Sequence, residues 1–296
     1  MEEGVPKSTS KRRSPFLRGC LIMVLVLAAF FLLLLGISRM DGLSLSKGGK
    51  VAVIPVAGMI SDSEQVIEQL KKFGADNAVK AIVLRINSPG GGVAPSQEIY
   101  EEVRKLNARK PVLTSMGSIA ASGGYYIAAA TRKVYANPGT MTGSIGVVMP
   151  FVNVKDLVDK IGLKGMAVKS GEFKDIGSPL REMTPQDRQI LQSVVDNVHL
   201  QFVNAVAAGR NLPREEVSRI ADGRILTGEQ ALALGLVDAL GNLEDTVADA
   251  GKLGGIPGEP KIVTPPKSKI SVLDILREEM RSMIDGKMGG NPLHLN

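Results

Sequence analysis

The sequence contains no tryptophan, one cysteine and two histidines in 296 residues. The single cysteine, Cys20, excludes a disulfide within the chain. His199 and His294 form no cluster with it, so we expect no metal and no cofactor. The shortage also disfavours a Ser-His-Asp triad, because His199 falls in a helical apolar pattern and His294 in the last residues.

Aromatic residues make up only 4% of the chain, and the formal net charge is +6. Part of the positive excess lies in the N-terminal tail, and the rest is scattered among acidic residues. A nucleic-acid-binding protein would show a basic stripe with interleaved aromatics, so we expect no nucleic-acid partner. By contrast, 44% hydrophobic residues and 33 glycines are typical of an α/β protein with a sizeable core and many tight turns.

The longest apolar run covers residues 19–38 (GCLIMVLVLAAFFLLLLGIS). About 20 apolar residues suffice to cross the hydrocarbon core of a bilayer, and no A-x-A-like cleavage site follows. We therefore interpret residues 19–38 as an uncleaved transmembrane signal anchor in contact with lipid; a cleaved signal peptide is the alternative. The basic tail, residues 1–18, is expected in the cytoplasm. After a linker at residues 39–50, the chain would lie on the extracytoplasmic side of the cell (inner) membrane.

Beyond the linker, short aliphatic runs alternate with helical patterns, which predicts βαβ units and a mostly parallel sheet. We expect strands at residues 51–56, 81–86, 112–116, 134–136, 145–149 and 164–168. We expect helices at residues 61–73 (after a capping box), 95–107, 117–130, 185–208, 213–221, 227–234 and 243–253. Residues 51–254 would then form one domain. Residues 255–296 would form a C-terminal extension with an amphipathic helix at 270–284.

A candidate nucleophile lies in residues 118–126 (SIAASGGYY), where small residues join a strand to a helix. Ser122 falls at or beside the helix N-terminus, where free N–H groups stabilise negative charge. The N–H of Gly123 is then available to an oxyanion. Residues 87–92 (NSPGGG) follow a buried strand and can aim further N–H groups into a cleft. The alternatives are an N-cap serine between packing glycines and a flexible glycine turn.

A nucleophilic serine needs a base, and with so few histidines a lysine is the candidate. A free lysine titrates near ~10.4, so it acts as a base near neutral pH only where burial or neighbours favour its neutral form. Lys174 lies in the glycine-bearing loop 169–179 (KSGEFKDIGSP), beside Phe173. Asp175 would oppose deprotonation if its carboxylate lay close to the amine. Taken alone, Lys174 fits a surface lysine better.

Several segments, in the same order, resemble the bacterial signal peptide peptidase A (SppA) family in its short, single-domain form. The resemblance runs from about Val51 to Gly241 and rests on residues 87–91 (NSPGG), 122–126 (SGGYY), 142–147 (TGSIGV), 173–175 (FKD) and 222–238. It implies a Clp-protease/crotonase-like fold, a membrane-anchored serine endopeptidase with a Ser–Lys dyad, and a ring- or dome-shaped homo-oligomer. The implied substrates are remnant signal peptides and misfolded exported proteins.

The resemblance also assigns roles to residues of this chain. Ser122 matches the nucleophile and Lys174 the general base. Ser144 matches a serine that orients the lysine amine, while Gly91 and Gly123 match the donors of the oxyanion hole, with Gly90 as a neighbouring alternative. In such a ring, neighbouring subunits can contribute the serine and the lysine to one site.

Three other functions remain open at this stage. One is a crotonase-like acyl-CoA enzyme, which an outward-facing domain disfavours because CoA thioesters are cytoplasmic. The second is a non-catalytic membrane scaffold, and the third is a membrane protease that cleaves a single membrane partner.

Overall fold

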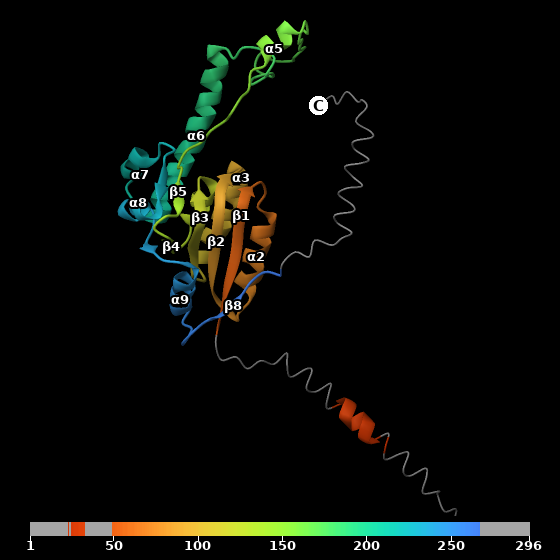
Figure 1. Cartoon of the computed structure of the whole chain (residues 1–296), viewed down its shortest axis with the longest axis vertical. Coiled ribbons are helices and arrows are strands. Elements are labelled where there is room, and N and C mark those ends of the chain that lie inside the picture. The colour runs from red at the N-terminus through yellow and green to blue at the C-terminus, as the bar shows by residue number, and fades with distance from the viewer. Residues whose placement is uncertain (1–22, 24, 33–48, 267–296) are drawn as a thin grey trace, which may run out of the picture. The chain divides into compact units, whose positions relative to one another are not determined.

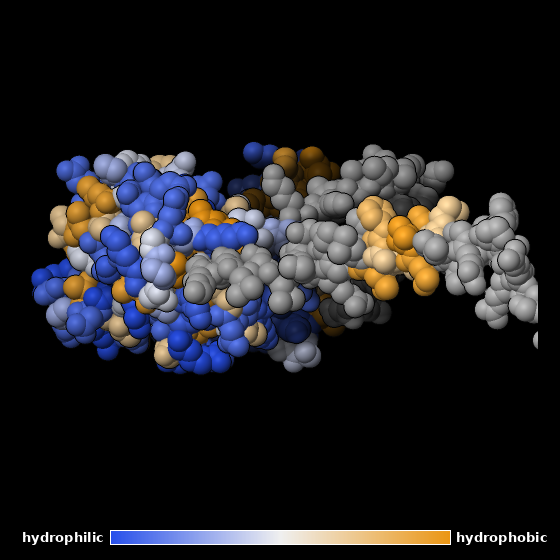
Figure 2. Space-filling model, turned by 90° about the horizontal axis from the view of Figure 1, so that it is seen from below, coloured by the Kyte–Doolittle hydropathy of each residue, from blue (hydrophilic) through white to orange (hydrophobic). Residues whose placement is uncertain are grey.

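A computed structural model describes residues 23, 25–32 and 49–266, and the chain divides into two compact units, Met1–Lys47 and Gly48–Asn296. In the first unit, the described residues are helical, and their large apolar side chains form the group of orange atoms that lies among grey atoms in Figure 2. Among the described residues, no helix is long and apolar enough to cross a membrane. Most of the predicted anchor (19–38) and linker (39–50), the tail (1–18) and the predicted helix at 270–284 lie outside the described residues.

The second unit is built on an eight-stranded sheet with strand order β6-β5-β3-β2-β1-β8, while β4 pairs with β3 and β7. All strand pairs are parallel except β5 with β6, so the sheet is mixed. The strands are β1 (Lys50–Ile60), β2 (Val79–Gly91), β3 (Val112–Ala121), β4 (Lys133–Ala136), β5 (Met141–Gly143), β6 (Ile225–Thr227), β7 (Ala239–Leu240) and β8 (Lys261–Val263). Strand β8 lies beyond the predicted domain end at residue 254, a boundary that stays a prediction.

Helices cover both faces of this sheet (Figure 1). They are α2 (Glu64–Ala75), α3 (Val93–Asn107), α4 (Gly123–Ala128), α5 (Lys155–Lys160), α6 (Pro185–Arg210), α7 (Arg214–Ile220), α8 (Gly228–Ala233) and α9 (Leu243–Leu253). The main core lies on one face, where side chains of α2, α3, α4 and α6 pack on β1–β3. A smaller core lies on the other face under α9. Because central parallel strands are buried on both faces, their sequences are almost continuously aliphatic.

Helix α6 belongs to the core only in its second half. Phe202, Val203 and Val206 are buried there, and a Cβ added to Gly209 would lie 2.0 Å from the carbonyl oxygen of Ala129. Figure 1 shows the first half of α6 leading away from the sheet towards α5. We call residues 148–188 the arm. Large apolar side chains are exposed along it: Val148, Val152, Leu157, Ile161, Leu163, Met166 and Val168.

The structure corrects several sequence-based predictions. No strand forms at 145–149 or 164–168; the chain leaves the sheet after β5, and Val148 is 84% exposed. The helix predicted at 117–130 is confined to α4, because β3 continues to Ala121 in register with β5. The predicted capping box is absent: α2 begins at Glu64, and the hydroxyl of its N-cap, Ser63, donates to Glu98.

Candidate active site

Ser122 is held between a strand and a helix in a rare backbone conformation. It follows β3 directly and is the N-cap of α4, with φ 51° and ψ −122°. Its N–H donates to the carbonyl of Gly143 (2.9 Å), and its own carbonyl accepts from the N–H of Tyr126 (2.8 Å). A non-glycine residue at positive φ costs about 1–3 kcal/mol and persists where the surroundings fix it, most often at functional sites.

The end of β2 packs against this serine with no room for side chains. Gly90 and Gly91 have positive φ values of 109° and 159°. A Cβ added to Gly90 would lie 2.8 Å from both the Gly123 nitrogen and the Ser122 Cβ, and one added to Gly123 would lie 3.4 Å from the Gly91 nitrogen. The backbones of Gly91 and Gly123 therefore lie close together beside Ser122. The side chain of Ser122, the N-cap, forms no capping hydrogen bond to α4, the short helix that begins at Gly123.

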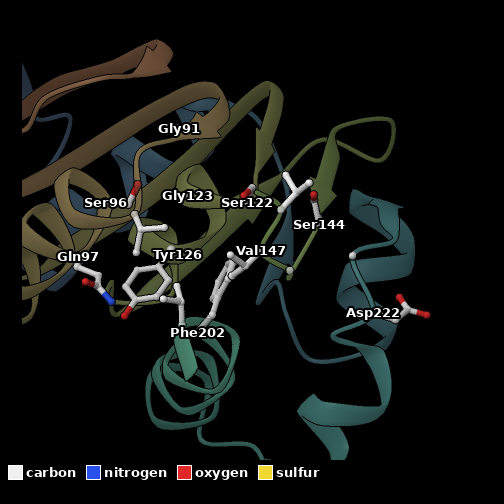
Figure 3. Close-up of a pocket in the computed structure, with 15 residues that line it drawn as sticks. Gly91, Ser96, Gln97, Ser122, Gly123, Tyr126, Ser144, Val147, Phe202 and Asp222 are labelled. Carbon is white, nitrogen blue, oxygen red and sulfur yellow. The ribbon is translucent and has the colours of Figure 1, made fainter. Parts of the chain in front are cut away.

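Ser144 is brought beside Ser122 by strand register. Ala121 of β3 pairs with Gly143 of β5, and each serine is the next residue along its strand. Ser144 also has a positive φ of 51°, and its N–H donates to the carbonyl of Arg224 (2.8 Å). Figure 3 shows both serines at the same cavity.

The cavity has a volume of about 370 Å³ and a wall of mixed apolar and polar residues. It is lined by Gly91, Val93, Ser96, Gln97, Ser122, Gly123, Tyr126, Ser144, Gly146, Val147, Val148, Val198, Phe202, Asp222 and Gly223. Tyr126 packs against Phe202 of α6 with ring centroids 4.9 Å apart and the rings tilted by 51°, and burial raises the pKa of the Tyr126 hydroxyl. Gln97 of α3 donates to Gln201 of α6 (2.8 Å), which ties the two walls together.

Lys174 does not line this cavity; it is exposed on the arm, in a turn where its N–H donates to Gly171 (3.2 Å). The neighbouring Asp175 is bound to Arg181, which also binds Asp187 in the first turn of α6. An α-helix rises ~1.5 Å per residue, so Asp187 lies about 22 Å along α6 from Phe202. The structure therefore gathers Gly91, Ser122, Gly123 and Ser144 and leaves Lys174 apart from them within one chain.

His199 lies on α6 next to Val198 but does not line the cavity. Its Nε2 is buried and has no hydrogen-bond partner among the described residues. The sequence analysis assigned no role to three residues that do line the cavity, Gln97, Phe202 and Asp222. The only signal for Phe202 was the helical apolar spacing that it shares with Val198.

Comparison with known proteins identifies the class of this site. The sequence model of the Clp protease family matches residues 50–142, and that of Peptidase family S49 matches residues 104–256. With the α/β architecture above, this defines a serine peptidase with a Clp-protease-like fold and a mixed sheet. The predicted fold class is confirmed to that extent, while the transmembrane helix that was part of it is not shown.

Relatives extend the match over most of the chain. "Putative protease slr0021" of Synechocystis sp. is 46% identical over 208 residues, 70% of this chain and 75% of that protein. "Putative signal peptide peptidase SppA" of Enterococcus faecium is 39% identical over 67% of this chain and 62% of the Enterococcus protein. "Protease 4" of Salmonella typhi is 38% identical, and the match spans only 35% of its length. The chain belongs to Peptidase family S49 and is an SppA-type serine peptidase.

Proposed function

We propose that this protein is a membrane-anchored endopeptidase that degrades remnant signal peptides and misfolded exported proteins through a Ser–Lys dyad. The observation that carries the proposal is the strained, half-buried Ser122, which lies beside the backbone of Gly91 and Gly123 and lines a cavity with them. The name of the Enterococcus relative supports the substrate class. The apolar composition of residues 19–38 supports the anchor.

The proposed reaction is acyl transfer. The neutral amine of Lys174 takes the hydroxyl proton of Ser122 as the oxygen attacks a peptide carbonyl carbon. The N–H groups of Gly91 and Gly123 donate hydrogen bonds to the oxyanion, the term that usually contributes most to such catalysis. The Lys174 ammonium then protonates the leaving amine. Water hydrolyses the resulting ester, which releases the carboxylic acid and regenerates Ser122.

We further propose that the lysine reaches Ser122 from a neighbouring copy of the chain in a homo-oligomer. About 16 Å of α6 separates Asp187, to which the loop of Lys174 is bound through Arg181, from Val198, the nearest residue of α6 that lines the cavity in the same chain. The exposed apolar side chains of the arm are the kind of surface that binds another protein. Ser144, next to Ser122, would receive and orient the incoming amine.

The cavity suits the proposed substrates. Side chains such as Val147, Tyr126 and Phe202 form an apolar part of its wall, and Asp222 is the one charged residue among the described residues that line it. An apolar side chain of a signal peptide would enter it without leaving a buried charge unpaired.

Paired variants test the proposal in the full-length protein in detergent, with a quenched fluorescent signal peptide as substrate. We expect Ser122→Ala and Lys174→Ala each to lower kcat/KM by at least about 10³-fold, and Lys160→Ala, on the same arm, to leave it unchanged. Oligomers reconstituted from a mixture of the two inactive variants would regain part of the activity, because some sites then combine an intact Ser122 with an intact Lys174.

The outcomes separate the alternatives. Full activity of Lys174→Ala would refute the dyad, while inactive mixed oligomers would refute only its assembly between copies. Wild-type protein that folds and oligomerises but cleaves no peptide would favour the scaffold.

A further inference from the structure

A carboxylate that lies near a lysine base and has no other cationic partner weakens the base, because it stabilises the ammonium form of the lysine. Two carboxylates occupy such positions around the proposed dyad, on which this inference rests. Asp175 follows Lys174 in the chain, and Asp222 lines the cavity that would receive the amine. We propose that Arg224 and Arg181 are positioning residues that bind these two carboxylates and keep them from pairing with the base.

Arg224 donates four hydrogen bonds to the Asp222 carboxylate. The Arg224 Nε donates to Oδ1 (2.8 Å) and to Oδ2 (3.0 Å), Nη2 donates to Oδ2, and the Arg224 backbone N–H donates to Oδ1 (3.1 Å). Figure 3 shows the Asp222 side chain turned away from Ser122. The carbonyl of Arg224 accepts from Ser144, so the ion pair is connected to the site by the backbone.

Stability alone does not account for the Asp222–Arg224 pair. The two side chains are 49% and 55% exposed, and exposed ion pairs contribute little to folding free energy. At the cavity rim, however, the pair has an electrostatic effect: the guanidinium cancels the charge of the only carboxylate among the described lining residues. Arginine suits this role because it stays charged at all relevant pH values and binds a carboxylate with two parallel donors.

The Asp175 carboxylate is bound in the same manner on the arm. The Arg181 Nε donates to Oδ2 (3.1 Å), its Nη2 to Oδ1 (3.0 Å), and Lys169 Nζ to Oδ1 (2.7 Å). These cations hold the pKa of Asp175 down, at about 2. The loop that carries Lys174 is thereby closed on itself and tied to α6, while its acidic neighbour is already paired.

Other charged groups around the base do not change this arrangement. Near Lys174 in the chain and at the start of α6 they are Lys169, Glu172, Glu182, Asp187 and Arg188; earlier on the arm lie Lys155, Asp156, Asp159, Lys160 and Lys164, and His199 lies on α6 beside the wall residue Val198. Asp187 is bound to Arg181, and Glu182 accepts from Asn153 (2.9 Å). Glu172 is exposed, so water and salt screen its charge. Within the part of the chain that the structure describes, no carboxylate forms an ion pair with Lys174.

The test is the pH dependence of kcat/KM of the full-length protein from about pH 6 to about pH 10. Arg224→Gln opens the Asp222 carboxylate, so deprotonation of the base would require a higher pH. We expect the midpoint of the rising limb to move up by about 0.5–1 unit and kcat/KM at pH ~7 to fall about 3- to 10-fold, with the high-pH plateau kept. Adding Asp222→Asn would return the midpoint to its wild-type position.

The second pair of variants concerns the arm: the single variant Arg181→Gln and the double variant that adds Asp175→Asn. We expect the midpoint of the rising limb to move up in the single variant and to return to the wild-type position in the double variant. Arg181 also binds Asp187, so circular dichroism and thermal unfolding verify that the arm variants are folded. Arg188→Gln is the matched control, since Arg188 is near the same helix end and in no ion pair among the described residues. We expect its profile to match the wild type.

A purely structural role would lower the plateau without moving the midpoint, and removing the carboxylate would not restore it; either result overturns the inference. The Lys174→Ala variant distinguishes failure of this inference from failure of the proposed dyad. If that variant is inactive and the midpoints do not move, only the role of the arginines is refuted. If it is fully active, the base itself is wrong and the inference fails with it.

Discussion

Replacing Ser122 by glycine should stabilise the protein while abolishing its activity. The backbone strain at φ 51° and ψ −122° amounts to about 1–3 kcal/mol for a residue with a Cβ, and glycine removes it. Glycine also gains freedom in the unfolded chain, which offsets roughly 0.5–1 kcal/mol. The Ser122 side chain forms no hydrogen bond within the described residues, and glycine retains both backbone bonds. The net stabilisation is therefore about 1 kcal/mol.

Thermal unfolding followed by far-UV circular dichroism measures this difference, because the chain has no tryptophan for fluorescence. All variants are compared at one protomer concentration, since assembly would shift Tm. A gain of about 1 kcal/mol corresponds to a Tm increase of about 2–4 °C for a domain of this size. Ser122→Ala is the companion variant: it retains the Cβ, so its Tm stays near the wild-type value although it is equally inactive.

Ser61→Gly serves as the matched control at an exposed serine with ordinary φ. There, glycine relieves no strain, so stability falls by up to about 1 kcal/mol. If Ser122→Gly melts no higher than Ser122→Ala, the backbone of Ser122 stores no strain, and the conformational argument for its role as nucleophile is lost.

Three further predictions concern other parts of the site. Gly123→Ala would place a Cβ 2.4 Å from the Ser96 hydroxyl and displace the donor N–H, so we expect kcat to fall by about 10²-fold or more; Gly139→Ala, with nothing within 4 Å, is the kinetic control. Phe202→Ala removes a buried ring from both core and cavity wall and would lower the free energy of unfolding by about 3–5 kcal/mol, as urea titration measures. Asp187 is bound by its arginine partner, which holds the pKa of its carboxyl below the ordinary value of about 3.9. Its stabilising contribution is thus complete above about pH 4 and is lost as the pH falls further, so Asp187→Asn would flatten the acid limb of a Tm-against-pH curve. An unchanged limb in that variant would contradict the assignment.

The strands and helices of the core were predictable because their apolar residues are buried in the way that their sequence pattern indicates. The aliphatic runs that became β1, β2 and β3 were recognised, and so were α6 and α9, although β2 extends to Gly91 and β3 to Ala121. The runs at 145–149 (IGVVM) and 164–168 (KGMAV) also contain several apolar residues but form no strand. An aliphatic pattern indicates that a segment avoids water, and it does not distinguish pairing in a sheet from exposure on an arm that another molecule could cover.

The candidate site was predictable in part for a similar reason. The turns around Gly91, Ser122 and Ser144 are local, and parallel strands bring their ends to one edge of the sheet. The position of Lys174 depends on the path of the arm, and its proposed contact depends on a second copy, which one sequence does not contain. The ion pairs of Asp175 and Asp222 were equally hidden, because adjacency in the chain does not say which cation a carboxylate binds.

The single helix α6 has one more consequence. Its 26 residues run without a break from the turn that carries the arm's ion pairs to the wall formed by Val198 and Phe202. In an assembly where each arm supplied the base for the next copy, one helix would belong to two catalytic centres, about 16–22 Å apart along its axis. A substrate that displaced the wall of one centre would then also move the segment that positions the base of the next, so in such an assembly the turnover of neighbouring centres would be correlated.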